Sequence, residues 1–308
     1  MPVLRHLLLG IAAVSFSYAL PTAAQPAQQN GRQIERVQAP SIADQELATY
    51  RFESFTLSSE DGKRHYKIEV GIPKRPAPAT GFPVIYMLDG NAALTNIDTT
   101  DLTAMDALSP TVLVAIGYDI NGSHDTTARA YDYTPPVFKD GVEQKEIEVR
   151  GRIGGGAAEF LELIETRIKP EVDLRAPTDH SRQTLWGHSY GGLFTLYTLF
   201  TRPELYQRYV AGDASLWWHD GFLVTDTFTH FDRSKALGKK IRLMEGGNRS
   251  KSRSASDSRA QWSAKDIVRD LQMDGVDISY ENFSELHHGQ MLRASLKPAL
   301  RLAATPPQ

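Results

Sequence analysis

The sequence contains no cysteine among its 308 residues. This absence excludes disulfide bonds, thiolate nucleophiles, zinc sites with cysteine ligands and lipid attachment at a cysteine. A secreted chain without cysteine is more typical of the bacterial periplasm or exterior than of an animal extracellular space.

A strong excess of charge is also missing. The chain has 34 basic and 37 acidic residues, a formal net charge of −3. Losing one arginine with the first 24 residues would leave 33 minus 37, or −4. This balance does not predict a nucleic-acid partner.

Long apolar runs are scarce, and the one that starts at Leu7 and ends at Leu20 is short for a membrane span. Arg5 precedes it, and small residues end at Ala24. This pattern predicts a secretory signal over residues 1–24, cleaved before Gln25. A polar, Gln-rich lead-in without periodicity follows over 25–44. We therefore expect a periplasmic protein without stable membrane association.

Residues 45–308 predict one α/β domain with a central, mostly parallel sheet flanked by helices. Two antiparallel strands are expected first, over Tyr50–Ser58 and His65–Pro73. Apolar runs predict strands at 83–89, 111–118, 181–186, 209–212, 240–245 and 278–283, and helical spacing predicts helices at 157–172, 192–200, 259–273 and 291–304. Two polar segments, 118–156 and 246–258, are expected to be irregular and to lie at the functional site.

The segment 185–192 reads Leu-Trp-Gly-His-Ser-Tyr-Gly-Gly and contains the pattern G-x-S-x-G. This pattern is typical of a nucleophile elbow, a strained strand-to-helix turn that lifts a serine hydroxyl above the sheet edge. Side chains at Gly187 or Gly191 are expected to collide with neighbouring elements. The flanking strand and helix occur in the required order. The sequence therefore predicts the α/β-hydrolase fold with Ser189 as nucleophile.

A serine hydroxyl needs a base, and in this fold the base follows the last strand. His287 and His288 meet that requirement. His288 is preferred because the glycine after it gives the backbone freedom to turn the ring toward the sheet edge, and His287 is the alternative. A metal site at this pair is not favoured, because no carboxylate cluster accompanies it.

The acid that would orient the base is less sharply defined. Glu245 ends an apolar strand, which is the usual place for it, whereas Asp213 and Asp257 also lie between nucleophile and base. Glu245 is preferred, and a Ser-His dyad without a fixed acid stays open. The oxyanion donors are expected to be the backbone N–H groups of Tyr190 and Asn91, although Asp-Gly-Asn at 89–91 is also an ordinary turn.

Several motifs together resemble the periplasmic siderophore esterases, which are esterase-D-like members of the α/β-hydrolase superfamily. The resemblance covers roughly residues 45–303. The esterases in question are similar to the enzymes that open enterobactin and salmochelin. It rests on Met-Leu-Asp-Gly-Asn at 87–91, Arg-Ala-Tyr-Asp-Tyr-Thr at 129–134, the elbow at 185–193, Met-Glu-Gly at 244–246 and Leu-His-His-Gly at 286–289.

This resemblance implies hydrolysis of the ester bonds in a tri-serine trilactone that carries catechols, so that iron is released. It implies Ser189 as nucleophile, His288 as base and Arg129 as a substrate contact, and the closest members are dyads. The sequence departs from the wider family at 212–215, where Gly-Asp-Ala-Ser stands in place of the commoner Ser-Pro-Ser. That change bears on pocket shape more than on chemistry.

A ferric tris-catecholate is anionic and aromatic, so guanidinium groups and indole rings would suit it. Four residues are predicted to bind it: Arg129, Trp217, Trp218 and Arg249. Further basic residues in the two irregular segments either join them or form a solvated face: Arg150, Arg152, Lys251 and Arg253. No cofactor or protein-bound metal is expected, since the iron belongs to the substrate.

Two other functions stay open at this stage. A general carboxylesterase or thioesterase of the same family would need an apolar acyl tunnel in place of a basic, aromatic mouth. A non-hydrolytic ferric-siderophore binding protein would have no use for a strained elbow, so the motif at Ser189 argues against it.

Overall fold

A computed structural model describes residues 40–144, 146–247 and 263–306. The expected signal at 1–24, most of the lead-in at 25–44, and the candidates Arg249, Lys251, Arg253 and Asp257 lie outside the described residues. Within the described ranges, no helix combines the length and apolar character that crossing a bilayer requires.

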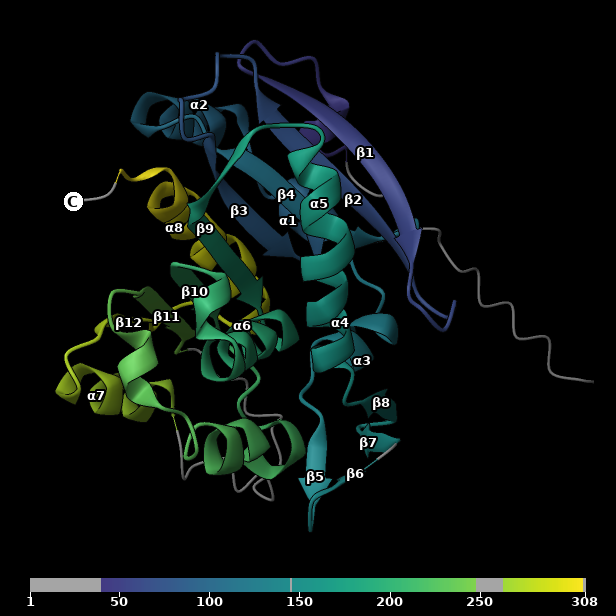
Figure 1. The fold of residues 1–308 in the computed structure, drawn as a ribbon, viewed down its shortest axis with the longest axis vertical. Coiled ribbons are helices and arrows are strands. Elements are labelled where there is room, and N and C mark those ends of the chain that lie inside the picture. Colours follow the sequence, from purple (N-terminus) through teal and green to yellow (C-terminus); the bar gives the residue numbers. More distant parts are fainter. Residues whose placement is uncertain (1–39, 145, 248–262, 307–308) are drawn as a thin grey trace, which may run out of the picture. The chain divides into compact units, whose positions relative to one another are not determined.

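The centre of the fold is an eight-stranded sheet with the strand order β1-β2-β4-β3-β9-β10-β11-β12 (Figure 1). β1 and β2 form an antiparallel pair, β2 pairs antiparallel with β4, and all further pairs are parallel. The strands are β1 (Tyr50–Ser58), β2 (His65–Pro73), β3 (Phe82–Leu88), β4 (Val112–Tyr118), β9 (Thr178–His188), β10 (Arg208–Gly212), β11 (Lys240–Gly246) and β12 (Asp277–Phe283). The predicted mixed, mostly parallel sheet is thus confirmed.

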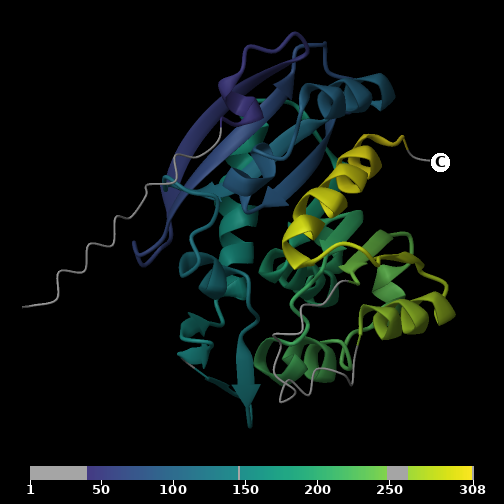
Figure 2. The same cartoon turned by 180° about the vertical axis from the view of Figure 1, so that it is seen from behind.

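Helices cover both faces of this sheet, because its central strands alternate buried side chains between the two sides. On one face Tyr86 and Leu185 pack with α4, α6 and α7 in one apolar cluster. On the other face Met87 and Trp186 pack with α1, α2 and α8 in a second cluster. Figure 2 shows the fold from behind, with α8 in yellow in the foreground. The helices are α1 (Gly90–Leu94), α2 (Thr99–Leu108), α3 (Ala128–Asp132), α4 (Ala157–Leu163), α5 (Lys169–Asp173), α6 (Tyr190–Thr201), α7 (Ala264–Met273) and α8 (Met291–Ala304).

The predicted single helix over 157–172 is interrupted. A π-helical turn, η2 (Ile164–Ile168), separates α4 from α5, and Pro170 is the second residue of α5. Proline lacks a backbone N–H and cannot continue the regular ladder of hydrogen bonds.

The segment 118–156 is more ordered than its composition predicts. After α3 it forms two small antiparallel hairpins, β5 (Val137–Lys139) with β6 (Val142–Gln144), and β7 (Ile147–Val149) with β8 (Arg152–Gly154). Gly155 donates its backbone N–H to Thr134 Oγ1 at 2.8 Å, which ties the second hairpin to the end of α3. Short hairpins of three-residue strands give almost no periodic signal, so sequence patterning misses them.

Candidate active site

Ser189 lies at the turn between β9 and α6 with φ 61° and ψ −118°. A residue other than glycine is rarely found with positive φ, and such strain is common at active sites. The turn is held because Ser189 N–H donates to the Gly212 carbonyl at 2.9 Å. The predicted elbow is therefore present in the backbone.

The glycine requirement is unequal at the two flanking positions. A Cβ added to Gly187 would collide with the backbone of Gly191, so this position excludes any side chain. At Gly191 the nearest atom to an added Cβ is Leu88 Cβ at 3.4 Å, an ordinary contact distance. The expectation of a collision at Gly191 is therefore wrong.

A line of hydrogen bonds joins Ser189, His288 and Asp213. The distance from Ser189 Oγ to His288 Nε2 is 2.9 Å, and from His288 Nδ1 to Asp213 Oδ2 it is 2.5 Å. His288 opens the short turn η7 (His288–Gln290), whereas its neighbour His287 caps that turn and lies outside the line. The structure thus brings the preferred histidine, and not its alternative, to the elbow serine.

The acid at His288 is Asp213, and the expectation for Glu245 is wrong. Glu245 is still part of β11, opposite Asn282 of β12, and its carboxylate accepts the Tyr280 hydroxyl at 2.8 Å. Asp213 follows the end of β10 in a left-handed conformation with φ 42°, and its N–H donates to the Met244 carbonyl at 2.6 Å. The sequence offered Asp213 only as an alternative, because it lies between the nucleophile and the base along the chain.

A second histidine, His188, lies against the first. Its Nε2–H donates to the His288 carbonyl at 2.8 Å, and the two ring centroids are 4.8 Å apart. Burial, followed by the neighbouring His288, lowers the pKa of His188 to about 4. His188 is therefore neutral at pH 7 and adds no positive charge that would oppose a proton on His288.

The side-chain donor atoms of His188, Asp213 and His288 lie within 4.8 Å of one another, a spacing that a metal ion could also use. The hydrogen bonds account for this cluster, because both ring nitrogens of His288 already have partners in Ser189 and Asp213. The donor set fits a proton relay better than a metal centre, whose ligands must keep a lone pair for the ion.

A second hydroxyl also reaches the nucleophile. Ser215 is 2% exposed, its Oγ lies 3.3 Å from Ser189 Oγ, and its N–H donates to the Ser189 carbonyl at 3.0 Å. Ser215 ends the segment 212–215, and no motif in the sequence predicts its contact with Ser189. Only the fold shows it, since the loop after β10 passes beside the elbow.

The expected oxyanion donors belong to elements at the same edge of the sheet. Tyr190 begins α6, and the first N–H groups of a helix have no partner within it. Asn91 lies in α1, where its side chain donates to the Tyr118 carbonyl at 3.0 Å and accepts the Tyr118 N–H at 2.9 Å. This pair of bonds fixes the start of α1 on β4. The oxyanion roles stay predictions.

Arg129 forms a buried ion pair instead of an open contact. Its Nε and Nη2 donate to the two oxygens of Asp89 at 2.8 and 2.7 Å, and its side chain is 12% exposed. Asp89 directly precedes α1 and has left-handed φ and ψ of 51° and 49°. Arg129 therefore holds the turn between β3 and α1, and its predicted contact with substrate stays a prediction.

The family follows from comparison with known proteins. A family model described as "Putative esterase" matches residues 59–302. The chain belongs to this esterase family. It is 32% identical over 296 residues to an apo-salmochelin esterase of Escherichia coli, a match that covers 94% of this chain and 90% of the relative.

Further relatives agree with this assignment. The esterase is 31% identical over 261 residues to a ferri-bacillibactin esterase of Bacillus subtilis, with 81% and 88% of the two chains covered. The structure of an enterobactin and salmochelin hydrolase, IroE, matches with a TM-score of 0.71 and 33% identity, over 86% of this chain and 99% of that one. The α/β-hydrolase architecture and the hydrolase class of this protein are thereby shown.

The esterase uses its two adjacent tryptophans differently. Trp218 is 2% exposed and packs against Gly154 of β8, so the prediction that it binds the substrate is wrong. Trp217 is partly exposed, its ring lies 6.0 Å from that of Tyr190, and the Arg150 guanidinium carbon lies 3.6 Å from its centroid. Trp217 is therefore placed for the predicted contact, and Trp218 supports the hairpin beneath it.

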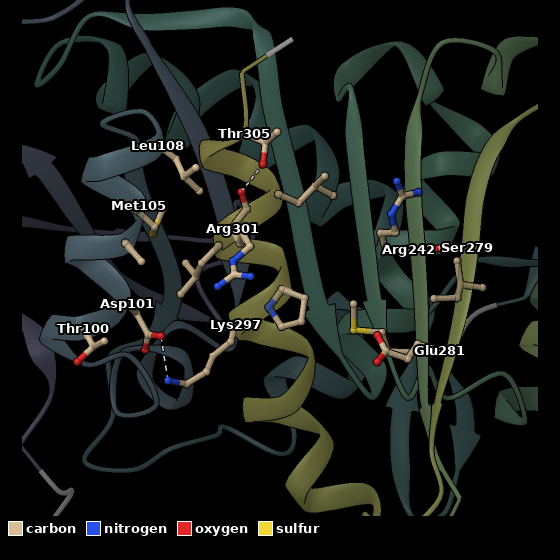
Figure 3. Close-up of a pocket in the computed structure, with 16 residues that line it drawn as sticks. Thr100, Asp101, Met105, Leu108, Arg242, Ser279, Glu281, Lys297, Arg301 and Thr305 are labelled. Atoms are coloured by element: carbon tan, nitrogen blue, oxygen red, sulfur yellow. Dashed lines mark hydrogen bonds and ion pairs between the residues drawn. The ribbon is translucent and has the colours of Figure 1, made fainter. Parts of the chain in front are cut away.

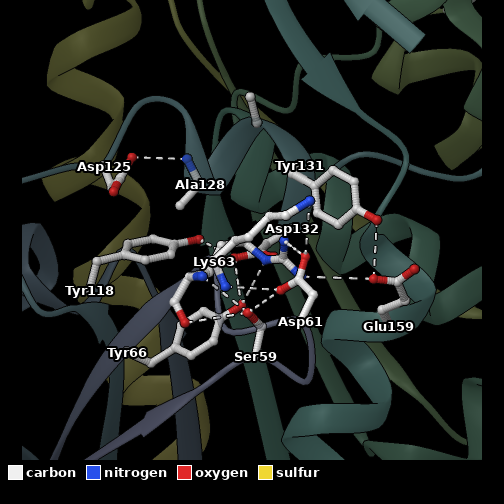
Figure 4. Close-up of polar contacts among 12 residues, drawn as sticks. Ser59, Asp61, Lys63, Tyr66, Tyr118, Asp125, Ala128, Tyr131, Asp132 and Glu159 are labelled. Carbon is white, nitrogen blue, oxygen red and sulfur yellow. Dashed lines mark hydrogen bonds and ion pairs between the residues drawn. The ribbon is translucent and has the colours of Figure 1, made fainter. Parts of the chain in front are cut away.

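A polar network around Asp132 joins α3 to β2 and β4 (Figure 4). Asp132 accepts the hydroxyls of Tyr118 at 2.9 Å and Tyr66 at 3.1 Å, and pairs with Arg64 at 2.9 Å. Burial raises the pKa of Asp132 to about 7, against the opposing effect of Arg64 and the two hydroxyls. The network anchors α3, the helix that carries Arg129.

A pocket of about 730 Å³ lies elsewhere, between α2, α8, β11 and β12 (Figure 3). An ion pair of 2.9 Å between Lys297 and Asp101 closes one side of it. None of the residues in the line from Ser189 to Asp213 contributes to this pocket. It is separate from the candidate active site.

Proposed function

We propose that this protein is a serine esterase that hydrolyses the ester bonds of a catecholate tri-serine trilactone siderophore, of the enterobactin kind, and so assists iron release. The hydrogen-bonded line from Ser189 through His288 to Asp213 carries the proposal. The names of two relatives support the substrate class, because they are esterases of salmochelin and bacillibactin.

In this mechanism Ser189 Oγ attacks the ester carbonyl while His288 Nε2 takes its proton. The ester C–O bond then breaks, and His288 returns the proton to the leaving serine alcohol. Water then attacks the acyl-enzyme while His288 Nε2 takes its proton. The bond between the acyl carbon and Ser189 Oγ breaks, and His288 returns the proton to Ser189. Asp213 keeps His288 in the required tautomer and stabilises its cation.

We assign the stabilisation of the negative charge on the carbonyl oxygen to the backbone N–H groups of Tyr190 and Asn91. Removing one such donor typically costs about a hundredfold to a thousandfold in rate. Arg129 and Asp89 hold the turn that precedes Asn91, and His188 holds the backbone of His288. These two contacts keep donors and base at the distances the reaction needs.

We place the protein in the periplasm, after cleavage of the signal at 1–24. The n-region at Arg5, the uncharged apolar run and the small residues before Gln25 support this location. Fractionation of cells expressing the full chain, with N-terminal sequencing of the released form, tests both points.

The functional test is chromatographic. Wild-type protein and Ser189→Ala are incubated with ferric and iron-free enterobactin, and linear trimer, dimer and monomer are separated. The proposal expects linear products from the wild type alone. Turnover of p-nitrophenyl butyrate without siderophore products would indicate a general carboxylesterase. Tight siderophore binding without any turnover would indicate a binding protein and contradict the mechanism.

A further inference from the structure

The turn of the β7–β8 hairpin presents an arginine toward the candidate active site. Arg150 and Gly151 form this two-residue turn with φ values of 55° and 72°. Positive φ at both positions is typical of the tightest hairpins, which usually place asparagine or glycine there. An arginine at such a tip has a rigidly defined backbone.

The hairpin is anchored at its other end. Ile147 is 8% exposed, and the closely packed Gly154 leaves no room for a side chain beside Trp218. Gly156 N–H donates to the Tyr131 carbonyl at 2.9 Å, just after β8. The position of Arg150 is therefore fixed by buried contacts at the base of the hairpin.

Arg150 ends a row of two adjacent rings between two guanidinium groups, in the order Arg129, Tyr190, Trp217, Arg150, which lies next to the nucleophile. Its guanidinium carbon lies 3.6 Å from the Trp217 centroid, and the Trp217 ring lies 6.0 Å from that of Tyr190. Tyr190 directly follows Ser189, and Arg129 lies 5.4 Å from its ring. Trp217 stands two residues after Ser215, whose hydroxyl contacts Ser189.

The positive charges around Tyr190 converge from two elements. Burial raises the pKa of the Tyr190 hydroxyl, and the charges of Arg129, Arg150 and Arg152 each oppose that rise. Arg129 comes from α3, whereas Arg150 and Arg152 come from the hairpin. This side of the elbow therefore combines flat aromatic surface with positive charge.

We propose that Arg150, stacked on the partly exposed Trp217 and backed by the buried ring of Tyr190, forms a subsite for an anionic aromatic arm of the ester substrate. Guanidinium groups stack on aromatic faces and donate in the plane of the group, so a ring with negatively charged oxygens meets both surfaces at once. This subsite rests on the proposed esterase function and assigns Arg150 to substrate specificity, not to the bond-breaking steps.

The test uses two synthetic esters that differ by one charge, p-nitrophenyl benzoate and p-nitrophenyl 4-carboxybenzoate, together with ferric enterobactin. The ratio of kcat/KM for the charged ester to that for the neutral ester is measured in wild type, Arg150→Ala and Trp217→Leu. Arg269→Ala is the charge-matched control, because Arg269 pairs only with Asp266 and Asp270 of its own helix among the ion pairs described.

We expect Arg150→Ala to lower that ratio about tenfold or more, mainly through KM, with the neutral ester within about twofold of wild type. Trp217→Leu lowers the ratio similarly, and Arg269→Ala leaves it unchanged. We expect kcat/KM for ferric enterobactin to fall in Arg150→Ala and Trp217→Leu, as it does for the charged ester.

An unchanged ratio in Arg150→Ala overturns the subsite, as does an equal loss on both synthetic esters. Failure of the wild type on ferric enterobactin, with turnover of the synthetic esters, contradicts the proposed siderophore substrate instead. The two failures are thus separate results.

Discussion

The ends of β10 and β11 each present a carboxylate at the same edge of the sheet, but only one reaches the base. Asp213 leaves β10 in a left-handed conformation and contacts His288, whereas Glu245 continues in β11 and bonds to Tyr280. A strand alternates its side chains between the two faces, so a residue still inside it is committed to a face. A residue just past the strand is free to turn, and its backbone angles decide where the carboxylate lies.

Neutralising each carboxylate in turn tests which of the two supports catalysis, and it has the largest expected effect. We expect Asp213→Asn to lower kcat by about a thousandfold to ten-thousandfold, because an amide favours the wrong tautomer of His288. Glu245→Gln should stay within about threefold of wild type. Steady-state kinetics on p-nitrophenyl butyrate measures both, with thermal unfolding as the control for folding. A greater loss of kcat in Glu245→Gln than in Asp213→Asn would mean that Glu245 of β11 acts as the acid.

The hydrogen bond from His188 to the His288 carbonyl holds the base in place. His188→Ala removes the N–H that holds the His288 carbonyl, and we expect kcat to fall about tenfold to a hundredfold. His188→Gln keeps a donor and should recover most of that loss. Equal activity in both variants and wild type would show that the β10 acid alone holds His288 in place.

The same histidine predicts a pH effect on stability. The pKa of His188 is lowered from 6.5 to about 4 in the folded state. Between these values the unfolded chain binds the proton and the folded chain does not, so stability is lost as pH falls from 6.5 to 4. This contribution is at most about 3 kcal/mol.

Urea unfolding of wild type and His188→Gln at pH 7 and at pH 4.5 measures this loss. We expect a larger drop in the free energy of unfolding for wild type, since glutamine does not titrate. Equal drops in the two proteins would mean that His188 is protonated in the folded state at the lower pH.

Removing the partner of Glu245 has the smallest expected effect, and it tests whether Glu245 contributes to catalysis. Tyr280→Phe removes the hydroxyl that donates to Glu245, and we expect kcat/KM within about twofold of wild type. The strand pairing of β11 with β12 still fixes the backbone of Glu245. If the variant rescues Asp213→Asn in the double mutant, Glu245 is able to replace the lost acid once released.

Local sequence patterns predict the helices and strands and the chemistry that depends on adjacent residues. Local strand patterns predict the two antiparallel strands, continuous apolar runs predict the buried parallel strands, and helical spacing predicts α8, since burial dictates each of these patterns. The G-x-S-x-G motif determined the turn at Ser189, because a strained turn leaves a mark in adjacent residues. The position of His288 after the last strand followed from chain order.

Which distant side chains meet depends on the tertiary structure. The contact of His288 with Asp213, the burial of Trp218 and the ion pair of Arg129 with Asp89 join segments that are far apart along the chain. Each depends on a few backbone angles past a strand end and on strand register, which leave no periodic trace. Local sequence fixes what an element is, and packing at the sheet edge fixes what its last residue touches.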